Sequence, residues 1–290
     1  MIASILVQTL VNGSVYALLA AGLTLVFGVG RLLNLAHTVF FVLGGYIMYS
    51  LTRTLGWGPI PSIAVTVVGA ALLGVLAYRF IIDRVRHHPQ AVLLITVALA
   101  MFIQEILYWG FGDYYRTSPS LMSGVTVILG IHVSNEYLLI IGVMVVVMII
   151  LWLLLAKTKL GTAIRATAND AEIASLMGIS VSRTLMITMG IATALAGLAA
   201  SLVGSLWITY PVAWMEPLTT VLIIVVLGGL GSLKGSIIAA YLMALAELLA
   251  YNFVPNGNFL AKPFMLLFLI IVLVVRPGGL FGIILEEERL

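Results

Sequence analysis

Two glutamates lie within long apolar blocks of the sequence, where a carboxylate has the strongest reason to do chemistry. Glu105 follows Gln104 in the block 90–112, and Glu247 lies towards the end of the block 235–254. A charged side chain at the centre of a membrane-spanning helix costs roughly 2.5–3.5 kcal/mol, so such an acid normally faces water or a partner, or is protonated. Two interpretations stay open: a water-lined path for a solute, or hydrogen-bonded structural acids between helices.

The histidines and the lack of cysteine indicate no catalytic or metal centre. The four histidines form no His-Glu-x-x-His pair, no Gly-x-Ser-x-Gly is present, and the sequence has no cysteine. His87 and His88 stand beside an arginine and are expected to be solvated. Asn34 and His37 are kept as candidates for the solute path, although packing is the favoured role of His37. We expect no catalytic residue, no metal and no cofactor on this chain.

The segment 157–183, KTKLGTAIRATANDAEIASLMGISVSR, is too long and too regularly patterned to be a simple connector. Asn169 is predicted to cap a short helix, with Glu172 three residues later completing a capping box. Asp170 and Glu172 suit the positive N-terminal end of that helix, and Gly178 is predicted to end it. The apolar residues of the predicted helix cluster on one side: Ile173, Leu176 and Met177.

A helix of this kind has no evident task within an isolated protein. A short amphipathic helix held out from the membrane is suited to a groove on a partner protein. An interfacial helix that lies on lipid headgroups is the alternative. We therefore predict that the segment 157–183 is a docking loop for another subunit.

A glycine-rich run, GGLGSLKGS at 228–236, is denser than helix packing requires. It predicts a helix–turn–helix break at a membrane surface, built on Gly228, Gly229, Gly231 and Gly235. The run is not a phosphate-binding loop, because Lys234 precedes its glycine instead of following it. The segment FGVGRLL at 27–33 holds only two glycines of a dinucleotide fingerprint. If ATP is used, another subunit must bind it.

Composition places these elements in lipid. Of the 290 residues, 62% are hydrophobic and 9% are charged, and the mean hydropathy is +1.21, whereas a soluble domain is about 25% charged. A helix needs roughly 20 apolar residues to cross the hydrocarbon core. Charge-poor blocks predict spans at 3–29, 35–51, 60–82, 90–112, 137–156, 184–207, 218–232, 235–254 and 263–276.

The predicted fold class is therefore an all-α polytopic membrane protein with eight or nine transmembrane helices, formed by one domain over residues 1–290. The second, seventh and ninth spans are short, and some of them are expected to be broken or re-entrant, which is tolerated where protein covers the backbone. The net charge of +3 is small and the basic residues are scattered, which argues against a nucleic-acid surface. No basic residue precedes the first apolar run, so a retained helix is favoured over a cleaved signal.

The basic residues orient the predicted spans. If the loop 157–183 lies in the cytoplasm and the chain alternates sides, only Arg53, Arg116 and Lys262 of the 14 basic residues fall outside. The positive-inside rule then places the N-terminus outside and the C-terminus in the cytoplasm.

Four segments, taken in order along the chain, carry a family pattern. Residues 172–178 have the form of an EAA-x-x-x-G loop, keeping Glu172, Ala174 and Gly178 with isoleucine in place of the first alanine. NLAHTVFFVLGGY at 34–46 is similar to a second-helix signature, and RPGGLFG at 276–282 is similar to a C-terminal one. GGLGSLKG at 228–235 is similar to a glycine-rich break, with lysine where proline is common. Together they resemble the permeases of bacterial branched-chain amino acid ABC importers.

The resemblance implies the smaller of the two permeases of a high-affinity leucine, isoleucine and valine importer in the bacterial inner membrane. It implies a second, related permease in a heterodimer, two cytoplasmic ATPase subunits that bind ATP-Mg, and a periplasmic or lipid-anchored amino-acid-binding protein. Closely similar permeases serve urea, short-chain amides or other amino acids, so those substrates stay open. The coupling helix would be formed by Asn169, Asp170, Glu172, Ala174 and Gly178.

The implied mechanism is alternating access. Closure of the ATPase pair pulls on the coupling helices and tilts the spans around a central path at the permease interface. The outer loop 113–136 and the shorter 208–217 are expected to receive the binding protein. The alternative from a different class is a proton- or sodium-coupled carrier that uses Glu105 and Glu247. The loop 157–183 argues against it, because a self-contained carrier has no use for a docking loop.

Overall fold

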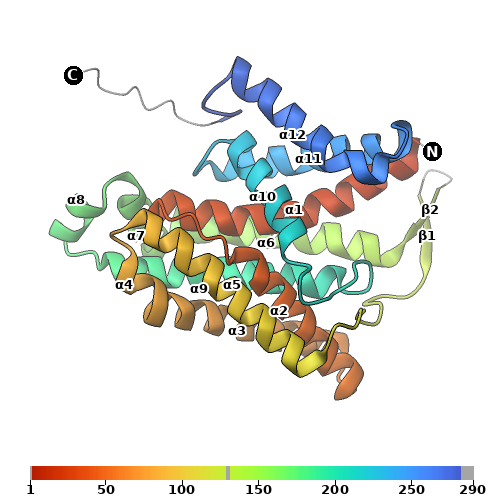
Figure 1. Cartoon of the computed structure of the whole chain (residues 1–290), viewed down its shortest axis with the longest axis horizontal. Coiled ribbons are helices and arrows are strands. Elements are labelled where there is room, and N and C mark those ends of the chain that lie inside the picture. The colour runs from red at the N-terminus through yellow and green to blue at the C-terminus, as the bar shows by residue number, and fades with distance from the viewer. Residues whose placement is uncertain (1, 129–130, 282–290) are drawn as a thin grey trace.

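The computed structural model describes residues 2–128 and 131–281. Almost all of its regular structure is helical, and the helices lie mostly along the long axis of the molecule (Figure 1). Within these described residues, six helical segments are long and apolar enough to cross a membrane. They are α1 (Ile2–Gly30), α3 (Pro59–Ala77) with its continuation η2 (Tyr78–Ile82) and α4 (Asp83–Val85), α5 (Pro89–Phe111), α6 (Asn135–Lys157), α9 (Val181–Val203) and α11 (Leu233–Phe253).

The remaining elements are shorter. Three are apolar and lie among the long helices: α2 (His37–Tyr49) with its π-helical continuation η1 (Ser50–Thr54), α10 (Met215–Gly228) and α12 (Gly257–Val275). The others connect them: the antiparallel hairpin of β1 (Val125–Ile128) and β2 (Ile131–Ser134), and two helices in the docking loop, α7 (Lys159–Asn169) and α8 (Ala171–Leu176). The chain is an all-α polytopic membrane protein, as predicted.

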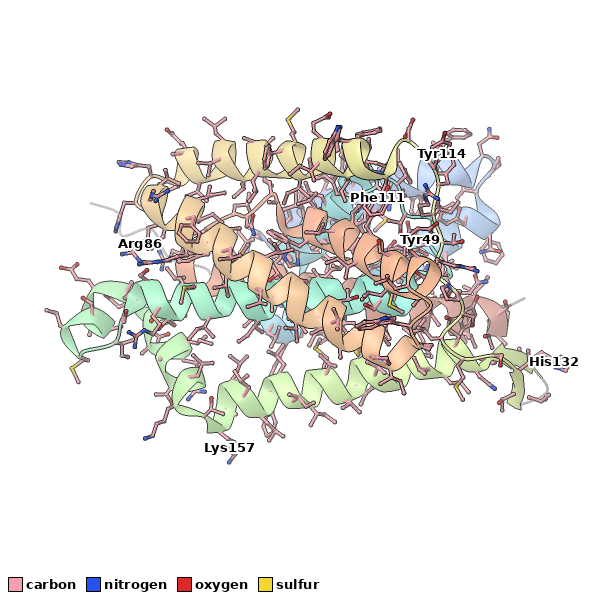
Figure 2. All side chains as sticks on the ribbon, turned by 90° about the horizontal axis from the view of Figure 1, so that it is seen from below. Tyr49, Arg86, Phe111, Tyr114, His132 and Lys157 are labelled. Carbon is pink, nitrogen blue, oxygen red and sulfur yellow. The ribbon has the colours of Figure 1, made fainter. Side chains whose placement is uncertain are left out.

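The two ends of the bundle carry different elements. The α8 end carries α4, α7 and α8, and the hairpin end carries the N-terminus of α1, β1 and β2 (Figure 1). Figure 2 shows Arg86 and Lys157 at the α8 end, whereas Tyr49, Tyr114 and His132 lie at the hairpin end. Arg86 and Lys157 thus lie at the opposite end of the bundle from Tyr49 and Tyr114.

Each of the nine predicted spans coincides with a helix in the described part of the chain, and three boundaries were wrong by four residues or more. The sixth helix, α9, ends at Val203 and not at residue 207, because a turn follows in which Trp207 N–H donates to Val203 O at 2.8 Å. The seventh helix, α10, ends at Gly228 and not at residue 232, because the glycine-rich turn follows it. The ninth, α12, begins at Gly257 and not at residue 263. The first part of α12 was predicted as a loop because Lys262 is charged. The Lys262 ammonium is instead paired with Glu247 within the bundle.

The two central helices are α1 and α9, which carry more buried residues than any other helix. α1 packs chiefly against α11 and α9, and α9 packs also against α3 and α2. Small residues permit the close approach: a Cβ on Gly44 of α2 would lie 2.9 Å from the Gly197 Cα of α9. By contrast, α5 and α6 leave most of their side chains partly or fully exposed and form opposite edges in Figure 2.

The glycine-rich run forms the turn between α10 and α11. Gly229 and Gly231 have φ values of +100° and +85°, which glycine adopts without the strain of a side chain. The C-terminal signature segment packs on this turn, with Leu280 N–H donating to Leu227 O at 2.8 Å. Its last residue, Gly282, and the basic residue Arg289 lie outside the described residues.

The helix α10 is too short to cross the hydrocarbon core by itself. Its 14 residues span about 21 Å, less than the ~30 Å hydrocarbon core. Irregular backbone at membrane depth is tolerated only where protein covers it or where it lines a cavity. The segment 204–214, which precedes α10, meets the second condition, because most of its residues line a cavity.

Candidate functional site

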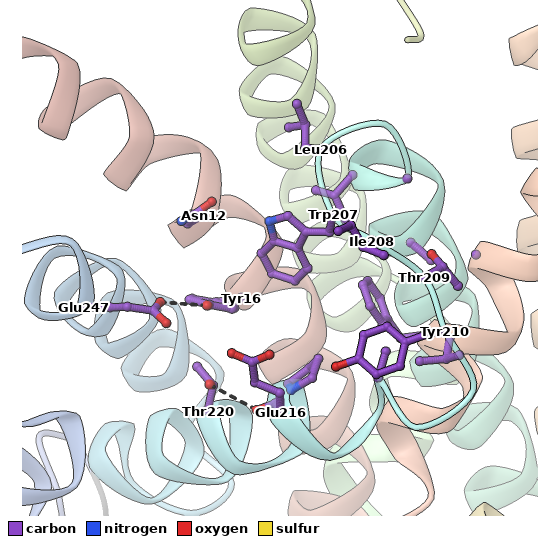
Figure 3. Close-up of a pocket in the computed structure, with 18 of the residues that line it drawn as sticks. Asn12, Tyr16, Leu206, Trp207, Ile208, Thr209, Tyr210, Glu216, Thr220 and Glu247 are labelled. Carbon is purple, nitrogen blue, oxygen red and sulfur yellow. Dashed lines mark hydrogen bonds between the residues drawn. The ribbon is translucent and has the colours of Figure 1, made fainter. Parts of the chain in front are cut away.

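A cavity of about 420 Å³ lies at the hairpin end, lined by α1, α2, α9, α10, α11, α12 and the segment 204–214 (Figure 3). Small-molecule sites usually measure about 300–1,000 Å³, so the volume suits a compact solute. Its walls combine aromatic rings with charged groups. They include Asn12, Tyr16, Trp207, Tyr210, Glu216, Thr220, Glu247 and Lys262.

An ion pair between α11 and α12 forms one wall of this cavity. Lys262 Nζ lies 3.0 Å from Glu247 Oε1 and donates to Thr220 Oγ1 at 2.7 Å. The second oxygen of Glu247 accepts a hydrogen bond from Tyr16 of α1 at 2.7 Å. Only 5% of the Glu247 side chain is exposed, so this carboxylate depends on its cation and hydrogen bonds for stabilisation.

The helices bring these groups together from distant parts of the sequence. Tyr16 lies on the central helix α1, while Glu247 lies on α11, which packs extensively against α1. The turn between α11 and α12 brings Lys262 back towards Glu247. A buried carboxylate thus meets one cation and one phenol, which is the arrangement that makes an intramembrane acid tolerable.

Glu216 stands at the other side of the cluster, in the first turn of α10. Its Oε1 is 3.6 Å from Lys262 Nζ, and 64% of its side chain is exposed. In Figure 3 its carboxylate points into the space between Tyr16 and Tyr210, with Trp207 above it. Burial, and next the Glu216 carboxylate, raise the pKa of the Tyr210 phenol.

The segment 204–214 roofs the cavity and is tied to the outer loop 113–136 at three points. Arg116 and Thr209 exchange backbone hydrogen bonds of 2.9 and 2.8 Å, and Ser118 N–H donates to Gly204 O at 2.7 Å. The buried carboxylate of Glu136 accepts from Ser205 Oγ at 2.6 Å. These contacts hold the roof against the loop that was expected to receive a binding protein.

The structure separates the residues that sequence reasoning proposed for the solute path. Glu247 lines the cavity, but Glu105 lies on the exposed face of α5 and receives only a 3.4 Å hydrogen bond from Gln104. Asn34 and His37 are buried in the bundle and do not line the cavity. Asn34 donates to Met189 Sδ at 3.4 Å, and His37 Nε2 contacts Leu19 O at 3.0 Å.

The docking loop forms two helices where one was predicted. α7 runs through Asn169, so the backbone of Asn169 is helical and cannot serve as the predicted N-cap. The N-cap of α8 is Asp170, which has extended backbone angles and accepts from Glu172 N and Ile173 N at 2.8 and 2.9 Å. The predicted capping box between Asn169 and Glu172 is therefore wrong.

The end of α8 follows from glycine geometry. Gly178 has a φ of +84°, and Ile179 N–H donates to Ala174 O at 3.0 Å. This is the left-handed helix end that glycine favours. Within α8 and its end, Ala174 is buried, whereas Ile173, Leu176 and Met177 are 60%, 81% and 78% exposed. An apolar ridge therefore projects from the α8 end of the molecule.

Sequence reasoning missed Tyr16, Glu216 and Lys262 as site residues. One signal was available for Lys262: an acid in an apolar span needs a counter-charge, and Lys262 was one of only three basic residues assigned to that side. No comparable signal pointed to Tyr16. No group of three or more His, Asp or Glu side chains that could hold a metal ion occurs in the described part of the chain.

Comparison with known proteins gives a consistent set of similarities. A profile of the family described as the permease component of branched-chain amino acid transport systems matches residues 5–275. The high-affinity branched-chain amino acid transport system permease protein BraD of Pseudomonas aeruginosa is 29% identical over 296 residues, covering 96% of this chain and 94% of BraD. No solved structure matches.

Two further relatives extend this range. The corresponding high-affinity permease protein LivH of Escherichia coli K12 is 29% identical over 293 residues, covering 93% of this chain and 92% of LivH. A probable branched-chain amino acid transport permease protein LivH of Methanocaldococcus jannaschii is 25% identical over 293 residues, covering 96% of this chain and 92% of that protein. The similarity thus extends over nearly the full length of each chain.

Proposed function

The chain belongs to the permease component family of branched-chain amino acid transport systems, and from this we propose that it is the membrane subunit of an ATP-driven importer of leucine, isoleucine and valine. Its residues 1–290 form one permease domain. The observation that best supports energy coupling from outside the chain is the apolar ridge of α8, which has no partner among the described residues.

In this proposal α8 is the coupling helix. Asp170 and Glu172 begin it, Ala174 anchors it to the loop, and Gly178 ends it. Ile173, Leu176 and Met177 insert into a groove on a cytoplasmic ATPase subunit, because a short helix with an exposed apolar face is recognised in this way. The position of Asn169, in the last turn of α7, makes it a hinge residue between the two helices and not a cap.

The complete transporter would contain two ATPase subunits that bind ATP-Mg, a second related permease and an amino-acid-binding protein. This chain itself carries no cofactor. Closure of the ATPases would move the coupling helices and tilt the spans, which alternates access to the path. Similarity to the high-affinity branched-chain amino acid permeases BraD and LivH supports branched-chain amino acids as the cargo.

The assembly makes a direct prediction about ATP. The purified chain alone should hydrolyse no ATP above background, because it has no phosphate-binding loop. Reconstituted with its partners, it should support leucine uptake that needs ATP, is stimulated by the binding protein and resists a protonophore at constant ATP. Phosphate release and radiolabelled uptake into proteoliposomes measure both. Hydrolysis by the lone chain, or loss of uptake on collapse of the proton gradient, would contradict the proposal.

The proposed orientation can be tested by single-cysteine labelling, since the chain has no native cysteine. Cysteines in place of His88 and Ser180, both exposed at the α8 end, should react with a membrane-impermeant maleimide only from the cytoplasmic side. Cysteines in place of Ser123 and Met215, exposed at the hairpin end, should react only from outside. The reverse pattern would place α8 out of reach of ATP and remove the basis of coupling.

A further inference from the structure

The cavity at the hairpin end has an excess of negative charge. Of the charged side chains that line it in the described chain, two are carboxylates, Glu216 and Glu247, and one is the ammonium of Lys262. Lys262 is already engaged: it donates to Glu247 at 3.0 Å and to Thr220 at 2.7 Å. At 3.6 Å from Glu216 it forms an ion pair with that carboxylate but no hydrogen bond, so a lone pair of each Glu216 oxygen is left for a ligand donor. Glu216 is therefore the carboxylate that remains open to a ligand.

Aromatic rings surround this carboxylate. Figure 3 shows Tyr16, Trp207 and Tyr210 on three sides of the space into which Glu216 points. The faces of aromatic rings carry negative potential and attract ammonium groups, and a carboxylate adds a charge-assisted hydrogen bond. The same rings also offer apolar contact to an alkyl chain. The wall thus combines recognition of a cation with recognition of a hydrocarbon.

Donors for an anionic group are available at another part of the wall. Asn12 presents an amide and Trp207 an indole N–H, both neutral. A ligand carboxylate could meet these groups without encountering an unpaired buried cation. The charge balance therefore makes the ammonium, and not the carboxylate, the group that the cavity selects electrostatically.

We propose that this cavity binds the transported amino acid within a single permease chain, with Glu216 as the residue that recognises its ammonium group. The inference rests on the proposed import function and sharpens it. A substrate must carry a protonated amine beside an aliphatic chain, so neutral solutes such as urea and short-chain amides are poor ligands for this cavity. The Lys262–Glu247 pair positions the wall and does not contact the ligand ammonium.

The test measures binding to the complete transporter, without its binding protein, in phosphatidylcholine nanodiscs. Radiolabelled leucine is displaced by leucine, by isoamylamine, which lacks the carboxylate, and by isocaproate, which lacks the amine. The affinity of the wild-type cavity for isoamylamine should exceed its affinity for isocaproate by about tenfold or more, because hydrogen bonds to charged groups are strong. Glu216→Gln should lower the affinities for leucine and for isoamylamine, each by about tenfold or more. Glu216→Asp should retain part of both affinities.

Asp113→Asn is the matched control, because Asp113 is exposed at the same end of the molecule but does not line the cavity. It should leave all three affinities unchanged. Unchanged leucine affinity in Glu216→Gln, or equal binding of isocaproate and isoamylamine, would overturn the inference. Weaker leucine binding when phosphatidylethanolamine is added would assign the ammonium site to a lipid headgroup and would also overturn it.

The same preparations separate this inference from the proposed function. ATP-driven leucine uptake by both the wild type and Glu216→Gln, with equal apparent KM, would leave the importer intact and refute the cavity assignment. Failure of the wild-type complex to take up leucine with ATP would refute the importer itself. Thermal unfolding and ATPase activity of each variant show whether a lost affinity reflects the site or the fold.

Discussion

Gly178→Val is expected to reduce ATP-driven leucine uptake by about tenfold or more, since a branched residue held at positive φ costs on the order of 1–3 kcal/mol. Gly178 has a φ of +84°, and a Cβ there would meet no atom within 4 Å. The effect is therefore backbone strain and not a steric clash. Relief of that strain moves the end of α8 and with it the exposed side chains of Leu176 and Met177.

Insertion and folding should survive this substitution, because the apolar spans are specified separately from the docking loop. The ATPases should co-purify poorly, or hydrolyse ATP without moving leucine, at matched membrane levels of the permease. Gly142→Val in α6 is the control: it too has open space around its Cβ but no positive φ, and should transport normally. Normal uptake by Gly178→Val would make the loop a passive connector.

The second large effect is expected at the ion pair in the cavity wall. Lys262→Met should destabilise the protein by about 3 kcal/mol or more, because it leaves a buried carboxylate without its counter-charge. Glu247 is 5% exposed and retains only the Tyr16 hydrogen bond in that variant. The measurement is the thermal unfolding midpoint in detergent, followed by leucine uptake.

A double-mutant cycle tests whether the destabilisation comes from the unpaired Glu247 carboxylate. Adding Glu247→Gln to Lys262→Met removes the orphaned charge, so the double variant should be more stable than Lys262→Met alone. Lys157→Met, at an exposed lysine at the end of α6, should change the midpoint little. Additive losses in the cycle would show that the pair makes no coupled contribution.

Local composition was sufficient to locate the membrane helices. Each apolar block became a helix because lipid requires every backbone group in it to be bonded internally. The turn at Gly229 and Gly231 and the helix end at Gly178 also followed from local rules, since positive φ is a property of single residues. The family resemblance rested on the same short segments. These features depend only on residues that are close together in the sequence.

The roles of the polar residues depended on packing across the bundle. Glu105 and Glu247 look alike in the sequence, yet one faces outward from α5 and the other pairs with Lys262 and Tyr16. The capping residue shifted from Asn169 to Asp170 because α7, which was not predicted, extends to Asn169. Tyr16 lies 231 positions from Glu247, and only the packing of α1 against α11 brings their oxygens together. The sequence by itself therefore determined where the chain crosses the membrane and where it bends. Tertiary structure alone decided which acid has a cation, because a counter-charge acts through distance in space and leaves no local mark in the sequence.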